Sequence, residues 1–163
     1  MTIVAGSLTG YISQANNFIV GNVQYTFYLN LLNSLNNNNF ILIRFPLPWI
    51  LYSNQCQVIS GITLAPRTNL TCLNYTSGSY VYLNVSNFLS ASVSNQLVFS
   101  IMLRSPSTPQ LYNVLIQTAN AYGILDSMIA NVTLNSTYGD YQMLSIDAIV
   151  AQSNVPVGGT GPL

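Results

Sequence analysis

Cys56 and Cys72 are the residues of this chain whose type and spacing most directly suggest a covalent bond. They are its only two cysteines, and an even count in a chain poor in charge favours a disulfide formed in an oxidising compartment. On the chain-entropy view, a bond that closes a loop of this size stabilises the fold by roughly 3 kcal/mol. Two buried thiols are the alternative. A metal site is disfavoured, because the chain has no histidine or further cysteine to complete it.

Acid–base and nucleophilic catalysis have little to work with here. The chain contains no Lys, Glu or His, and its acids are Asp126, Asp140 and Asp147. Serines are plentiful, but no histidine can act as their base. We expect the three aspartates to pair with arginine or to face solvent. The sequence therefore argues against an enzyme, and it predicts no metal and no cofactor other than covalent glycans.

Asparagine-linked glycans are the other covalent chemistry that the sequence allows. Asn-x-Ser/Thr sequons occur at Asn69, Asn74, Asn84, Asn131 and Asn135. Most of them fall in or beside predicted turns. Asn131 and Asn135 are four residues apart, so on a strand they would share one face, and we expect that face to be outward. The sequons are candidate glycosylation sites in a secreted protein.

Charge is nearly absent from the chain. Charged residues make up 4 % of it and the net charge is zero, whereas an average domain is about 25 % charged. Such a chain has nothing to attract nucleic acid or anionic lipid. Its longest apolar run, residues 45–52, is short and contains two prolines, so no membrane-spanning helix is expected. Because charge normally keeps monomers apart, we expect sugar or burial in an assembly to replace it.

The elements that must position these residues are strands. Residues 22–32 and 40–45 alternate apolar and polar side chains with a period of two, and an asparagine-rich tract separates them. Asparagine suits turns, so the sequence predicts an antiparallel hairpin over residues 22–46. Further strands are expected at 55–60, 70–75, 80–85, 96–104, 111–119, 124–137 and 141–151. The tract TSGS should join the strands at 70–75 and 80–85, and one or two helical turns are possible within 86–95. Strands at this spacing predict an all-β, immunoglobulin-like antiparallel sandwich with an extended terminal strand.

The two ends of the chain have their own patterns. Residues 4, 6, 8, 10 and 12 alternate large side chains with glycine on one face of a predicted strand. Such a strand could lie in a groove, with its large residues filling pockets and its glycines letting backbones approach; an ordinary first strand is the alternative. We divide the chain into this candidate donor strand (1–15), the sandwich (16–142), and a C-terminal strand with a Gly/Pro-rich tail (143–163). Residues 12–22 and 149–159 also place Ile, Gln, Asn and Val-Gly in similar order. Such an echo would fit a C-terminal segment that begins another domain, or one that occupies the equivalent position in a neighbour.

Several motifs in this order resemble a known family. They are FILIRFPLPWI, the two cysteines, YVYLNV, and QLVFSIMLRSPSTPQLYNVLIQTANAYGILD. Together, over residues 22–126, they resemble the immunoglobulin-like repeats of large secreted or cell-surface proteins of protists. In those repeats a strand ending in Phe-Pro precedes a cysteine pair, and a strand pair flanking a Pro-Ser loop ends near Ile-Asp. Here the end is Ile124, Leu125 and Asp126, one residue off that pattern.

The resemblance implies an extracellular, glycosylated β domain used in tandem or in an assembly. More loosely, the chain resembles glycan-coated subunits of extracellular filaments that exchange terminal strands.

These observations predict a structural subunit of an extracellular filament whose partners are copies of itself. A neighbour's terminal strand would pair with an open sheet edge and fill its groove. The expected donor residues are Val4, Leu8 and Ile12, and a C-terminal row is the second choice: Leu144, Ile146, Ala148 and Val150. The alternative is a cell-surface adhesin or carbohydrate-binding module whose surface tyrosines stack on sugars or partner proteins.

Overall fold

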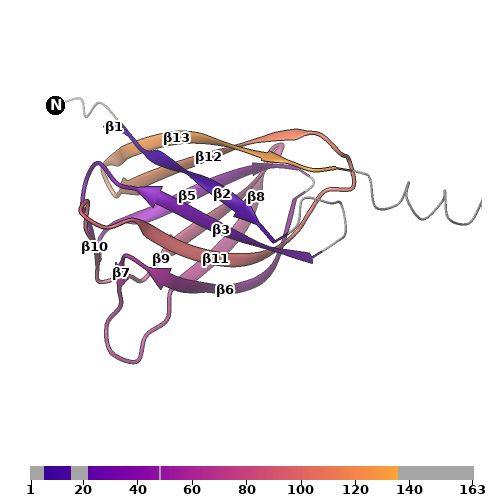
Figure 1. Cartoon of the computed structure of the whole chain (residues 1–163). Helices are drawn as coiled ribbons and strands as arrows, with labels where there is room; N and C mark the ends of the chain where they lie inside the picture. Colours follow the sequence, from indigo (N-terminus) through magenta and orange to yellow (C-terminus); the bar gives the residue numbers. More distant parts are fainter. Residues whose placement is uncertain (1–5, 16–21, 48, 136–163) are drawn as a thin grey trace, which may run out of the picture.

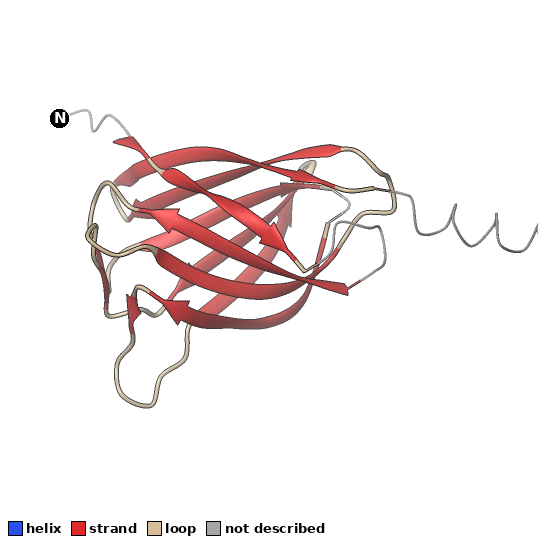
Figure 2. Cartoon of the chain, in the orientation of Figure 1, coloured by secondary structure: helices blue, strands red, loops and turns tan. Residues whose placement is uncertain are grey.

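The structure is a computed structural model that describes residues 6–15, 22–47 and 49–135 (Figure 1). All of its regular elements in these ranges are strands (Figure 2). Accordingly, this part of the chain has no helix long and apolar enough to cross a membrane.

The strands form two layers of a sandwich, and most neighbours run antiparallel. In the first layer the order is β13 (Gly123–Thr133), β12 (Leu111–Asn120), β5 (Phe40–Pro46), β9 (Tyr80–Ser86) and β8 (Thr71–Ser77). In the second it is β6 (Ile50–Ser60), β11 (Leu97–Arg104), β3 (Asn22–Asn30) and β2 (Thr9–Gln14). A small sheet of β4 (Leu35–Asn36), β10 (Ser90–Ala91) and β7 (Ile62–Thr63) closes one end, and β1 (Gly6–Ser7) pairs with β13. The predicted all-β sandwich is confirmed.

The core lies between the two layers because each strand turns alternate residues inward. In β3 and β5 the apolar members of the alternation are buried and their neighbours are more exposed. Phe27 stacks on Phe99 within its own layer, with ring centroids 5.0 Å apart. It also meets Phe45 of the opposite layer edge-on, at 6.3 Å. Contacts of this kind hold the layers face to face.

The predicted hairpin over residues 22–46 is wrong. β3 pairs with β2 and β11, whereas β5 pairs with β9 and β12, so the two strands lie in opposite layers. The tract between them is a connection across one end of the sandwich. It buries Leu35 and pairs β4 with β10. The alternation reported the burial of both strands correctly, but it carried no information about which strand each one pairs with.

Two other local predictions have opposite outcomes. β8 and β9 form the hairpin expected around TSGS, with Ser77 opposite Tyr80. The helical turns considered within residues 86–95 are absent. In this segment the backbone forms hydrogen bonds with other parts of the chain instead of within a helical turn. The Leu89 amide donates to the Thr63 carbonyl at 2.7 Å, and β10 pairs with both β4 and β7. Phe88, just before β10, and Ala91 within it are both buried.

The layers are joined at two opposite seams. At the disulfide seam, β6 and β8 share one paired position, Gln55 opposite Thr71. At the strand seam, residues 6–14 bridge from β13 to β3, because β1 pairs with β13 and β2 pairs with β3. Figure 1 shows this segment passing across the sandwich beside both strands.

Candidate functional site

The candidate site is the gap between β13 and β3, which we call the strand slot. It is filled by the chain's own residues 6–14. The first part of this segment runs parallel to β13, with Gly6 opposite Asp126 and Ser7 opposite Ser127. The Leu8 amide continues the ladder by donating to the Ser127 carbonyl at 3.1 Å. The second part then runs antiparallel to β3, from Thr9 opposite Asn30 to Gln14 opposite Tyr25. One segment therefore satisfies two sheet edges.

The inward side of this segment enters the core. Leu8 is 3 % exposed and belongs to the main apolar cluster, and Ile12 packs against that cluster while partly buried. On the outward side, Tyr11 stacks on Tyr28 of β3 with ring centroids 4.5 Å apart. At the far end the Gln14 side chain donates to the Thr133 carbonyl at 2.7 Å. The segment is held by backbone bonds, core packing and an outer aromatic pair.

The glycines sit where backbones and side chains approach most closely. Gly10 has a φ of 154°, in a range that L-residues rarely adopt. A Cβ there would overlap the carbonyl oxygen of Tyr28. A Cβ on Gly6 would lie 2.7 Å from Oδ1 of Asp126 and would overlap the end of the Leu32 side chain. The alternation of large residues and glycine therefore matches the shape of the slot.

Asp126 forms part of the slot wall, and its environment differs from the one we predicted. It is fully buried, so it does not face solvent. Its Oδ1 accepts a 2.7 Å bond from the Asn33 carboxamide, and its Oδ2 accepts bonds from the Asn33 amide at 3.1 Å and from the Thr118 hydroxyl at 3.3 Å. The expectation of an arginine partner or solvent is wrong at this position, because neutral donors satisfy the carboxylate. Sequence reasoning missed this cluster, since Asn33 is remote in sequence from Asp126 and Thr118, its partner across the β12–β13 hairpin, is unremarkable in type.

A buried phenol lies close to the strand slot. Tyr25 of β3, opposite Gln14, is fully buried, meets Trp49 edge-on at 5.2 Å, and its hydroxyl bonds to the Ser105 hydroxyl. Burial raises the pKa of Tyr25, because it disfavours the charged phenolate, and the bond to Ser105 only partly opposes this.

The remaining predicted interface residues are not all placed. Leu8 and Ile12 lie in the strand slot of their own chain, and Val4 is outside the described residues. The second-choice row also lies outside them: Leu144, Ile146, Ala148 and Val150. The sandwich fills its slot from its own sequence. The exchange of that strand between chains stays a prediction, as does the division of residues 1–15 from the sandwich.

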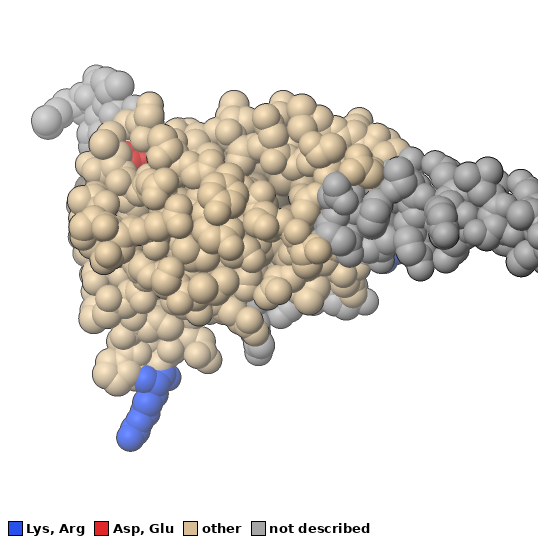
Figure 3. Space-filling view, in the orientation of Figure 1, with Lys and Arg blue, Asp and Glu red and all other residues tan. Residues whose placement is uncertain are grey.

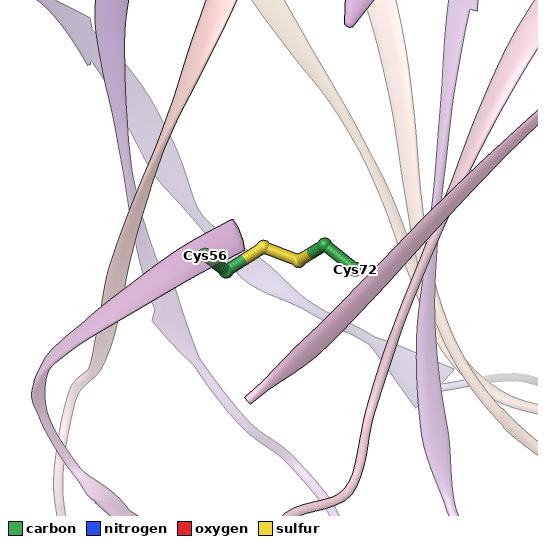
Figure 4. The surroundings of a disulfide bond; sticks show 2 residues. All are labelled: Cys56 and Cys72. Atoms are coloured by element: carbon green, nitrogen blue, oxygen red, sulfur yellow. A yellow bond between two sulfur atoms is a disulfide. The ribbon is translucent and has the colours of Figure 1, made fainter. Parts of the chain in front are cut away.

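The predicted disulfide is confirmed. Cys56 of β6 and Cys72 of β8 are bonded, with their Cα atoms 5.9 Å apart (Figure 4). Cys72 is fully buried and Cys56 nearly so. The bond lies beside the pair of Gln55 and Thr71. It therefore links β6 and β8 covalently at the disulfide seam, where these strands share only that one paired position.

The candidate glycosylation sites lie along the first layer and the loops beside it. Asn69, Asn74 and Asn131 are exposed, and Asn135 is partly buried. Asn84 lies in the middle of β9, opposite Leu42 and Leu73, and its side-chain oxygen is buried with no hydrogen-bond partner among the described residues. Three sequons are thus open to modification, while Asn84 is the most enclosed.

The surface has the neutral character that the composition predicts. Figure 3 shows a face made almost entirely of uncharged residues. On the outer side of β8 and β9, Tyr75 stacks on Tyr82 at 5.0 Å, and Tyr80 meets Tyr82 edge-on at 6.4 Å. The Arg44 guanidinium lies 4.3 Å from the centroid of the Tyr80 ring. We call these three tyrosines and Arg44 the tyrosine ladder. The sequence pattern alone does not identify which tyrosines form it.

Comparison with known proteins gives no family for this chain. No protein-family model and no curated protein matches it. Among solved structures, a cohesin module from a Clostridium perfringens family 33 glycoside hydrolase is similar at 14 % identity and a TM-score of 0.48, covering 80 % of this chain and 99 % of the module. BslA, a bacterial hydrophobin, is similar at 12 % identity and a TM-score of 0.45, covering 82 % and 98 %. The Corynebacterium diphtheriae major pilin SpaA is similar at 14 % identity and a TM-score of 0.46, covering 78 % of this chain and 37 % of the pilin.

These similarities are distant, and at such identities and TM-scores they carry no argument about function. None of the three is a protist repeat, so the specific resemblance to that family stays a prediction. The sandwich itself is established by the strand order described above.

Proposed function

We propose that this chain is a structural subunit of an extracellular glycoprotein filament, in which residues 6–14 of one copy occupy the strand slot of the next. The observation that carries the proposal is the bridging position of this segment. Among the residues that the structure describes, no other segment pairs with both β13 and β3.

Exchange of the strand would preserve its slot contacts. A second copy offers the same edges, the same pocket for Leu8 and the same close approach at Gly10, so the contacts inside the slot are equal in either arrangement. Swapping an identical element between copies is a low-cost route to assembly. If each copy donates to a different copy from the one it accepts from, donor and acceptor surfaces differ, the contact does not close, and a fibre grows.

The surface and the disulfide support the extracellular part of the proposal. The bond between Cys56 and Cys72 suits an oxidising environment. With so little charge, solubility would depend on glycans at the exposed sequons or on burial in the fibre. The proposed role is structural: it involves no catalysis, and the only added groups are covalent N-glycans.

The test is to image the purified protein and two altered forms by negative-stain microscopy. We expect the wild type to form long fibres and a chain lacking residues 1–12 to form none. Leu8→Asn in the full-length chain repeats the test without a deletion, and Thr9→Asn on the exposed side of the same strand is its control. Long fibres from the deleted chain would show that the N-terminal strand is not the donor.

A carbohydrate-binding surface module is the second candidate function. Two members of the tyrosine ladder, Tyr75 and Tyr80, are exposed, and aromatic rings of this kind can stack on sugars. A recess of about 540 Å³ at one end of the sandwich is lined by carboxamides and an exposed tyrosine, namely Asn36, Asn38, Asn39, Asn120 and Tyr122, with Ala121. A monomer that binds neutral glycans on an array, and loses that binding in Tyr122→Ala or Tyr75→Ala, would favour this function over the filament.

A further inference from the structure

We propose that the strand slot recognises the pattern Gly-x-Leu-x-Gly, residues 6–10, and so accepts the donor strand of a second copy of this chain in only one register, while it rejects strands that lack this pattern. This inference rests on the proposed function, because it concerns the strand that is exchanged. It assigns a specificity role to Gly6, Gly10 and Asp126, in addition to the apolar donor residues.

The position of Gly10 has the strictest requirement. A Cβ there would overlap the Tyr28 carbonyl oxygen and lie 3.0 Å from the Tyr28 carbonyl carbon and 3.1 Å from the Leu29 Cα. All three atoms belong to the backbone of β3, which is paired on its other side with β11 from Asn22 to Leu29. The backbone therefore cannot move aside without disturbing the second layer, and the φ of 154° adds strain for any other residue.

The position of Leu8 requires a large apolar side chain. Leu8 is 3 % exposed and packs into the main core cluster. Glycine at this position would leave a cavity, and cavities in a core are destabilising in proportion to their volume.

The position of Gly6 requires glycine because of Asp126. A Cβ would meet both the Leu32 side chain and Oδ1 of Asp126. Leu32 is 59 % exposed, so its end can rotate away. Asp126 is fully buried and its carboxylate is fixed by bonds from Asn33 and Thr118, so it cannot. The carboxylate therefore decides what fits.

The two glycine positions together exclude the registers shifted by two or four residues, which are the shifts that keep the same face of the strand turned inward. A slip of two residues in either direction brings Leu8 or Ile12 to the position of Gly10, where the β3 backbone excludes a side chain. A slip of four in one direction brings Gln14 there, which is also excluded. A slip of four in the other direction brings Gly6 there, which fits.

In that last register, however, Thr2 would stand where Gly6 belongs, and its Cβ would meet the Asp126 carboxylate. Asp126 thus removes the one alternative that the Gly10 position leaves. A strand from another protein is rejected by the same contacts unless it has both glycines at this spacing.

Peptide competition against the full-length wild-type protein tests this inference. Synthetic peptides of residues 1–15 would be added during fibre growth, and the concentration that halves the fibre mass measured. We expect the wild-type peptide to inhibit. Peptides with Gly10→Ala or Gly6→Ala should need at least about tenfold more, because overpacking a fitted contact typically weakens it by a factor of ten or more. Ser7→Ala and Thr9→Ala, on the exposed side of the strand, are matched controls and should stay within about twofold of wild type.

Each outcome is decisive. Weak inhibition by the two glycine variants alone supports the inference. Equal potency of all peptides overturns the register claim while leaving strand exchange intact. Fibres that no peptide inhibits would contradict strand exchange itself, and a wild-type protein that forms no fibres would overturn the proposed function together with the inference.

Discussion

The two seams of the sandwich join its layers in different ways. At the disulfide seam, β6 and β8 share one paired position, and a covalent bond between Cys56 and Cys72 holds the layers together. At the strand seam, residues 6–14 pair with both neighbours and are held only by non-covalent contacts. A covalent bond keeps its seam closed, whereas non-covalent contacts can separate and form again. Under the proposed function, the strand seam is therefore the one that opens to accept another copy.

Removing the covalent bond should have the largest effect of the variants that leave the chain's length unchanged. The double variant Cys56→Ser and Cys72→Ser is expected to lower the free energy of unfolding by about 3 kcal/mol, because its unfolded state regains the entropy of an open loop. Denaturant titration of the variant and of wild type, each as monomer, gives the difference. A change below about 1 kcal/mol would mean that the seam does not depend on its bond.

Emptying the Leu8 pocket should have the next largest effect. Leu8→Ala removes buried methyl groups at the strand seam, and we expect a loss of about 2 to 3 kcal/mol in the free energy of unfolding. It should also lower the yield of fibres, whereas the disulfide variant should weaken the monomer more than the contact between copies. The control is Thr9→Ala on the exposed side of the same strand, which should be nearly neutral. Equal effects of Leu8→Ala and Thr9→Ala would contradict the buried position of Leu8.

The buried phenol beside the strand seam predicts sensitivity to alkali. Because burial raises the pKa of Tyr25, its contribution to stability is fully present below the unfolded-state pKa of about 10 and is lost as the pH rises through the higher folded-state pKa. The free energy of unfolding of the wild type should therefore decrease above about pH 10, and that of Tyr25→Phe should decrease less steeply. At neutral pH that variant should lose about 1 kcal/mol through the missing bond to Ser105. Thermal unfolding across this pH range, with Tyr11→Phe as an exposed control, checks both statements; parallel curves for Tyr25→Phe and wild type would refute the first.

Removing the glycan predicted at Asn131, beside the strand seam, should change the intact mass of the protein but hardly its free energy of unfolding. Asn131 lies exposed on β13, one wall of the strand slot. We expect Asn131→Gln to lower the intact mass by one glycan while changing the free energy of unfolding by less than about 0.5 kcal/mol. The wild-type mass, compared with 17.8 kDa for the bare chain, reports how many sequons are occupied. A wild-type mass equal to that of the bare chain would rule out glycosylation.

Local pattern was enough to predict part of this fold. The alternation in β3 and β5 marked their buried faces, and the tract TSGS marked the turn between β8 and β9. The disulfide followed from the presence of two cysteines in a chain with almost no charge. Each of these features depends on residues close in sequence or on a simple count.

Pairing between distant strands could not be predicted in the same way. Alternation shows that a strand is half-buried, but it is the same whether β3 pairs with β5 or with β11. The site has the same difficulty. The pattern of large residues and glycine in residues 4–12 suggested a strand lying in a groove, and the structure gives Leu8 and Gly10 those environments. The environment of Asp126 could not be assigned, because its donor Asn33 lies far away in sequence and meets it only when the connection after β3 packs against the β12–β13 hairpin.

The most direct test of strand exchange is a high-resolution reconstruction of the fibre by electron cryo-microscopy. We predict that residues 6–14 of each subunit lie between β13 and β3 of the adjacent subunit, with Gly6 against the neighbour's Asp126 and the disulfide seam intact in every copy. Density in which residues 6–14 turn back into the slot of their own subunit along the whole fibre would contradict the account.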